Sequence, residues 1–156
     1  MVSVEVLRRY PFFSNLKDTH LSAIAMITEE VSVKEGTVFF EEGEPANTLY
    51  LLIEGYIDLY YKSEEKFYPK TRKQFTVGEI NPGEVFAIST LIEPYKYSAT
   101  ARASKKCRVL KIEGEPLREL LHMDFSAGYA MMCQIAKLAL ERLAYTRVQL
   151  AAAWAE

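Results

Sequence analysis

Residues 34–55 read KEGTVFFEEGEPANTLYLLIEG, and this stretch decides the fold. Its three glycines, Gly36, Gly43 and Gly55, separate short runs of Val, Phe, Leu, Ile and Tyr, the residue types that favour β-strands. Glycine suits tight turns because it adopts positive φ angles freely. The segment therefore predicts a series of short strands joined by glycine-containing turns.

The same pattern extends over about residues 31–112. Short apolar runs are separated by further turn residues, such as those at 81–84, which read NPGE. Strands this short and evenly spaced are typical of an antiparallel sandwich or jelly roll. The strongly charged stretch 62–73 is expected to form the tip of a long hairpin, as a solvated loop or as a docking patch.

Helices are expected on both sides of the strands. Asp18 is expected to cap a helix over residues 19–27. Pro116 suits the first turn of a later helix, and a second one follows from about residue 125 towards residue 154. We therefore expect an α+β fold, mainly a β jelly roll (double-stranded β-helix, cupin-like) with an N-terminal helix and two C-terminal helices. A single domain would comprise a helical lead-in (1–29), the jelly roll (30–113) and the C-terminal helices (114–156).

The last predicted helix contains few polar residues. A helix covered on one side shows an apolar stripe, not an apolar majority. We expect it to be covered by its own barrel and by a second subunit, giving a homodimer; burial within a monomer, or against a further domain, is the alternative. The predicted interface residues are Met131, Ile135, Leu138, Leu143 and Tyr145.

Composition excludes several classes of protein. The net charge of −2 argues against binding to duplex DNA, and no apolar run reaches the ~20 residues that cross a bilayer. The N-terminus lacks the apolar core of a signal peptide, so a cytoplasmic location is expected. Cys107 and Cys133 are predicted to be buried free thiols and not a disulfide. The start at Met1 favours a stand-alone module over a piece of a longer protein.

The sequence lacks the residues that an enzyme would need. His20 and His122 fall in different predicted helices, so no imidazole cluster is available to bind a metal ion. No GxxxxGK[ST] loop, GxSxG elbow or CxxC pair occurs. We therefore expect a non-enzymatic protein without a metal or cofactor.

Residues 34–55 closely resemble the opening of the cyclic-nucleotide-binding domain, the family of the catabolite activator protein, kinase regulatory subunits and nucleotide-gated channels. Residues 80–86 (INPGEVF) are similar to the approach to the family's phosphate-binding cassette, and residues 98–100 (SAT) to its end. Residues 11–13 (PFF) resemble the family's N-terminal lead-in. The resemblance covers nearly the whole chain and implies a regulatory module that senses a small molecule and acts on a downstream protein partner.

The cassette departs from the family pattern. The family has Gly-Glu-x-Ala after the Phe and Arg-Ser/Thr-Ala further on; the Gly holds the cyclic phosphate, the Glu accepts from the ribose and the Arg pairs with the phosphate. The resemblance puts Ala87, Ile88 and Tyr97 at the Gly, Glu and Arg positions. Two charge-assisted bonds of about 1.5–3 kcal/mol each are lost, so usual binding of cyclic AMP or cyclic GMP is not expected. The implied site residues are Gly83, Glu84, Phe86, Ala87, Ile88, Ser89, Tyr97, Ser98, Ala99 and Thr100, with Arg142 as a possible addition from the last helix.

Three alternatives stay open. The chain is a cyclic-nucleotide or other small-molecule sensor with a substitute cation, Lys96 or Arg142. A second register makes Gly83 and Glu84 the cassette pair. The third alternative is the ligand-binding half of a catabolite-activator-type transcription regulator, for which residues 155–156 leave no room for a helix-turn-helix.

The position of the Tyr97 ring is expected to decide whether the cassette keeps a cavity for a ligand. We predict that the Tyr97 ring fills the space of the ligand, with Phe86 buried, Ala87 opening a short helical turn and Ser98 on the incoming strand. An outward ring would instead leave a cavity for a largely apolar ligand, lined by Ala87, Ile88 and Ala99.

Overall fold

The structure, a computed structural model, describes residues 1–62 and 74–155. It comprises two compact units: residues 29–114 form one, and residues 1–28 together with 115–156 form the other. All of the predicted hairpin tip except residue 62 lies outside the described residues.

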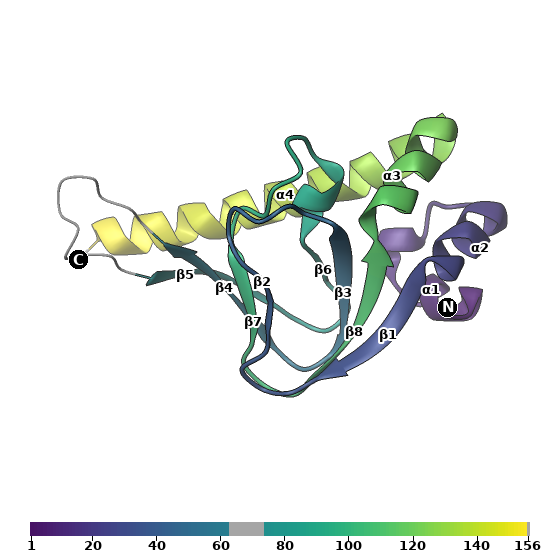
Figure 1. Ribbon diagram of the computed structural model, residues 1–156. Helices are drawn as coiled ribbons and strands as arrows, with labels where there is room; N and C mark the ends of the chain where they lie inside the picture. The colour runs from purple at the N-terminus through teal and green to yellow at the C-terminus, as the bar shows by residue number, and fades with distance from the viewer. Residues whose placement is uncertain (63–73, 156) are drawn as a thin grey trace. The chain divides into compact units, whose positions relative to one another are not determined.

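The first unit is a sandwich of two four-stranded antiparallel sheets (Figure 1), as predicted for a jelly roll. One sheet has the order β1-β8-β3-β6 and the other the order β2-β7-β4-β5. The strands of the first are β1 (Thr28–Val33), β8 (Cys107–Glu113), β3 (Thr48–Glu54) and β6 (Val85–Phe86). Those of the second are β2 (Val38–Phe40), β7 (Thr100–Ala103), β4 (Ile57–Lys62) and β5 (Gln74–Ile80).

Strand β3 supplies much of the core. Successive residues Leu49, Tyr50, Leu51 and Leu52 are all buried, so both faces of this central strand are covered. On one face, Tyr50 and Leu52 join an apolar cluster that also contains Phe40 and residues of β4, β7 and β8. This cluster is the interior into which the cassette residues project.

Gly55, between β3 and β4, is required by both its conformation and its surroundings. Its φ is +112°, and a Cβ there would lie 2.6 Å from both the Cys107 sulfur and the Lys106 carbonyl oxygen. Only glycine meets both conditions without displacing the start of β8. Gly55 thus lies in a turn, as the sequence predicted, and the structure adds that its backbone packs closely against the start of β8.

The second unit is helical. It contains α1 (Val4–Arg8), the 3₁₀ turn η1 (Pro11–Phe13), α2 (Asp18–Met26), most of α3 (Gly114–Met123) and all of α4 (Phe125–Trp154). The predicted N-terminal helix and two C-terminal helices are confirmed. The prediction that Asp18 caps α2 was wrong, because α2 begins at Asp18 and its N-cap is Lys17.

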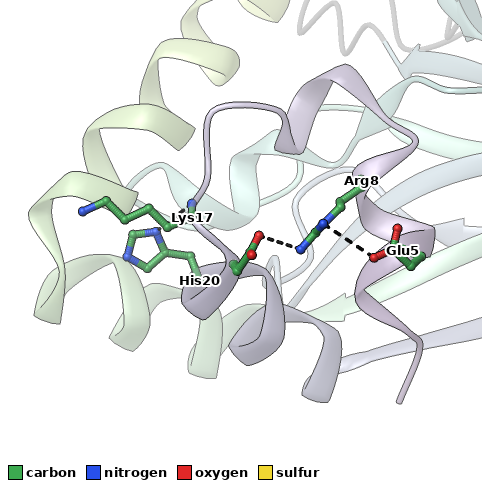
Figure 2. Close-up of polar contacts among 5 residues, drawn as sticks. Glu5, Arg8, Lys17 and His20 are labelled. Atoms are coloured by element: carbon green, nitrogen blue, oxygen red, sulfur yellow. Dashed lines mark hydrogen bonds and ion pairs between the residues drawn. The ribbon is translucent and has the colours of Figure 1, made fainter.

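An exposed ion pair joins α1 to the start of α2. The Arg8 guanidinium lies 2.6 Å from Asp18 Oδ1 and 3.6 Å from Glu5 Oε1. Figure 2 shows the Arg8 guanidinium with Glu5 of its own helix on one side and its second carboxylate partner on the other. These side chains are exposed, so the pairs contribute little to stability. Asp18 is therefore used in pairing and not in capping.

A buried histidine joins α2 to the start of α4. His20 Nδ1 accepts from the Lys17 backbone N–H (3.4 Å; Figure 2), which leaves the ring proton on Nε2 for donation to Asp124 Oδ2 at 2.6 Å. Asp124 is the N-cap of α4, and its other oxygen accepts from the Ala127 N–H. The hydrogen bonds from His20 and then Ala127 hold the pKa of the Asp124 carboxyl below its ordinary value of 3.8.

Candidate functional site: a modified cassette in the barrel

The backbone after β6 turns sharply at Ala87. This residue has φ 67° and ψ 37°, a left-handed conformation that glycine adopts most easily, and it opens the 3₁₀ turn η3 (Ile88–Leu91). The resemblance to the family assigned a glycine to this position. The backbone therefore has the geometry that glycine adopts most easily, although the residue is alanine.

The structure also bears on the alternative register. Gly83 and Glu84 lie in the turn before β6, where their backbones pair with Leu52: Gly83 N–H donates to Leu52 O (2.7 Å) and Leu52 N–H donates to Glu84 O (3.0 Å). Glu84 Oε1 accepts from the Asn81 N–H at 3.0 Å, within the same turn. This carboxylate is thus engaged within its own turn. The register that puts Ala87 and Ile88 at the Gly and Glu positions stays a prediction.

Tyr97 lies inside the barrel. Only 6% of its surface is exposed, and its ring stacks on that of Phe40 with 3.8 Å between centroids and 14° between planes. Its hydroxyl donates to the Thr48 carbonyl oxygen (3.1 Å) and accepts from the Thr48 N–H (3.2 Å). This position agrees with the prediction that the Tyr97 ring is buried.

A second cassette residue uses the same acceptor. The Thr90 hydroxyl, fully buried in η3, donates to Thr48 O at 2.8 Å. The Thr48 carbonyl therefore accepts hydrogen bonds from both ends of the cassette, one from η3 and one from residue 97. Sequence reasoning did not single out Thr48 or Thr90; the one available signal was a pair of threonines among buried apolar residues.

Two aromatic residues complete the interior next to Tyr97. Phe86 is fully buried as predicted and stacks on Tyr50, with 5.0 Å between centroids. Burial, followed by the neighbouring Tyr97, raises the pKa of the Tyr50 hydroxyl to about 12. Tyr50 therefore remains a neutral phenol at physiological pH and adds no charge to this aromatic cluster.

The remaining predicted cassette residues are less enclosed. Ile88 and Ser89 are half-buried in η3, and Ala99 is half-buried. Ser98 is exposed and precedes β7, which begins at Thr100, so its predicted place on the strand was wrong. The shift arises because the backbone of residues 95–97 pairs with residues 43–46 before β7 begins. Thr100 is buried, and its hydroxyl accepts from the Glu42 N–H at 3.1 Å.

The two candidate substitute cations lie in different units. Lys96 is exposed at the bridge to Pro45. Arg142 is half-buried on α4, in the helical unit, and its carbonyl accepts from the Thr146 hydroxyl. A role for either in binding a ligand stays a prediction.

The predicted interface residues of α4 divide into two groups. Met131 and Ile135 are buried at 1% and 3% exposure, so their assignment to a dimer surface was wrong. With Ala127 they form the face of α4 that the chain itself covers. Leu138 is half-buried, whereas Leu143 and Tyr145 are exposed and remain available to a partner.

The two free cysteines differ in exposure. Cys107 is a buried free thiol, but Cys133 is exposed on α4, so its predicted burial was wrong. Over residues 1–62 and 74–155, no group of three His, Cys, Asp or Glu side chains could hold a metal ion. In that same part of the chain, no helix is long and apolar enough to cross a membrane.

Comparison with known proteins agrees with the fold. Residues 30–124 match the model of the cyclic nucleotide-binding domain, so the chain belongs to that family. The structure of a "Putative Cyclic nucleotide-binding protein" from Geobacter metallireducens is 40% identical, with a TM-score of 0.80 over 92% of this chain and 99% of that one.

Two further matches are a catabolite activator protein and a putative potassium channel protein. The Thermus thermophilus catabolite activator protein shares the fold, with a TM-score of 0.68 and 20% identity over 90% of this chain and 62% of that one. A "Putative potassium channel protein" from Rhodopseudomonas palustris is 26% identical over 121 residues. Those residues are 78% of this chain but 27% of the channel, so this chain spans about a quarter of that relative's length.

Proposed function

We propose that this protein is a cytoplasmic, non-enzymatic regulatory module whose cassette does not bind cyclic AMP or cyclic GMP in the usual way. One observation carries the proposal: the Tyr97 side chain, at the position of the family's arginine, stacks on Phe40 and bonds to both backbone groups of Thr48. The barrel interior at this position is thus occupied by the protein's own side chain.

The chemistry of the site supports the same proposal. A cyclic phosphate needs a cation or converging N–H donors, but residue 97 is a tyrosine in a cluster of aromatic rings. Residue 88, at the position of the carboxylate that accepts from the ribose, is an isoleucine. Moving the Tyr97 ring out would expose an apolar area worth about 1.5–3 kcal/mol and break its hydrogen bonds. A nucleotide would have to offset that cost without the two usual anchors.

Calorimetry with cyclic AMP and cyclic GMP tests this proposal. We expect no measurable binding at nucleotide concentrations up to about 100 μM. The double variant Ile88→Glu, Tyr97→Arg restores both anchors and is expected to gain affinity, and Ile88→Glu alone serves as the matched control. A dissociation constant for the wild type near 1 μM, which corresponds to about 8 kcal/mol, would contradict the proposal. That result would support a sensor with a substitute cation, to be tested by Lys96→Ala and Arg142→Ala.

We propose further that two copies of the chain associate through α4 and that the two compact units act as one module. Besides Tyr145 and Val148, which lie off this face, seven large apolar side chains are exposed on this helix. These seven follow one another at intervals of three, four, seven or eight residues, which places them on one face. They are Phe125, Tyr129, Met132, Leu140, Leu143, Leu150 and Trp154. Every residue of α4 from Leu143 onward is exposed, so the last three turns lack cover from the described residues. A second α4 would bury this apolar face.

A further inference from the structure

A cavity opens on the side of the sandwich where β1 and β2 face each other. β1 ends one sheet and β2 ends the other, so these two strands, consecutive in the chain, do not pair. The cavity between them has a volume of about 180 Å³. Its walls include Val31 and Val33 of β1, Phe39 of β2, Tyr50 of β3 and Val109 of β8.

One charged side chain borders this apolar cavity. Lys111 follows Cys107 and Val109 at two-residue intervals on β8, and both of those are buried in the interior cluster. Because successive strand residues alternate between faces, Lys111 occupies an inner-face position, directly across from Tyr50. It is half-buried and forms no ion pair with any residue in the part of the chain that the structure describes.

We propose that this cavity, hereafter the β1–β2 pocket, binds a small apolar carboxylate, with the acid group paired to the Lys111 ammonium. The walls suit an aromatic or branched hydrocarbon body, and the single cation suits one negative charge. An apolar protein cavity of roughly 150 Å³ accommodates benzene, so the volume here fits a ligand of about the size of benzoate.

The β1–β2 pocket is separate from the cassette. Its lining contains no residue of the segment 82–100, and the ring of Tyr97 is not part of its wall. Ligand binding there therefore does not depend on whether the cassette accepts a nucleotide. The two locations share the aromatic cluster, since Tyr50 lines the pocket and also stacks on Phe86.

Calorimetric titration with benzoate tests the proposal. We expect saturable binding with a dissociation constant on the order of 1 mM, in keeping with a ligand of about ten heavy atoms. Benzyl alcohol, which has a similar body without the charge, is expected to bind about tenfold more weakly. Cyclic AMP at about 100 μM should leave benzoate binding unchanged. Because benzoate and cyclic AMP are titrated separately, failure of this proposal and failure of the cassette proposal are distinguishable.

Two variants locate the site. Lys111→Met is expected to weaken benzoate binding about tenfold, whereas Lys105→Met removes an equal charge from an exposed position outside the pocket and should have no effect. Val33→Phe fills the cavity and should abolish binding. The melting temperature without ligand, measured for each variant, shows whether it folds. Backbone amide shifts in NMR spectra give a second, variant-independent readout and should concentrate on β1 and β8.

Three outcomes would overturn the proposal. The first is the absence of saturable benzoate binding to the wild type. The second is affinity that is unchanged in both the Lys111→Met and Val33→Phe proteins. The third is a set of amide shifts centred on residues 86–100, which would place the ligand at the cassette instead.

Discussion

The ring of Tyr97 lies almost parallel to the ring of Phe40, and its hydroxyl bonds to both the N–H and the C=O of Thr48. This arrangement joins the end of the cassette to the start of β3. We expect Tyr97→Phe to keep the stacked ring but leave the Thr48 N–H without this partner, which should lower the free energy of unfolding by about 1 kcal/mol. Urea denaturation measures the change. Tyr61→Phe, at an exposed position on β4, is the matched control and should have no measurable effect.

The left-handed conformation of Ala87 gives a second prediction. Ala87→Gly removes a buried methyl group but relieves a conformation that costs alanine about 1–2 kcal/mol. The two effects nearly cancel, so the free energy of unfolding should stay within about 0.5 kcal/mol of the wild type. Ala101→Gly, at a buried position in β7, gains no such relief and should cost about 1–2 kcal/mol. Equal losses for the two variants would contradict the assigned backbone geometry.

Gly55 and Gly36 form another matched pair. Both have positive φ angles, but a Cβ at Gly36 would meet no atom within 4 Å, whereas one at Gly55 would overlap Cys107 and Lys106. We expect Gly36→Ala to cost about 1 kcal/mol from backbone strain alone, and Gly55→Ala to cost about 2–4 kcal/mol from strain and overlap together. Thermal unfolding followed by circular dichroism shows which variant loses more stability. A larger loss for Gly36→Ala than for Gly55→Ala would contradict the prediction.

The link between His20 and Asp124 predicts a dependence on pH. Because the folded protein lowers the pKa of the Asp124 carboxyl, the resulting stabilisation is present above the ordinary value of 3.8 and is lost as the pH falls through the lowered pKa. Asp124→Asn cannot ionise, so it should be less stable than the wild type at pH 5, and the gap should narrow towards pH 3. Chemical denaturation at several pH values in this window measures the gap. A constant difference would show that the carboxylate charge plays no part.

The exposed face of α4 predicts the oligomeric state. We expect the wild type to sediment as a dimer at micromolar concentration and Leu140→Glu to sediment as a monomer, because a carboxylate would enter the apolar contact. Lys137→Glu, an exposed charge change one turn earlier on the same helix, should leave the dimer intact. A wild-type monomer would contradict the proposed association.

Much of the fold could be predicted because local chemistry determines it. The glycine turns and the alternating apolar runs of residues 34–55 indicate strands directly, and the family resemblance indicates their arrangement. Pro116 and the apolar sequence after residue 125 likewise indicated α3 and α4.

The remaining features depend on contacts between distant residues. His20 and Asp124 are 104 positions apart, and no local pattern marks them as partners. Asp18 has the residue type of an N-cap, but pairing with Arg8 uses its carboxylate instead. The β1–β2 pocket is formed by side chains from four strands, so its volume cannot be read from any one segment. The exposure of each face of α4 depends on which residues the rest of the chain covers.

The sheet edges bear on how the protein behaves at high concentration. β6 has two residues and β2 has three, so neither offers a long row of free backbone groups. The other two edges carry exposed carboxylates, at Glu29 and Glu30 on β1 and at Glu79 on β5. Short or charged edges resist the addition of a strand from another molecule. We therefore expect crowded solutions of the protein to resist fibril formation even though α4 exposes apolar side chains.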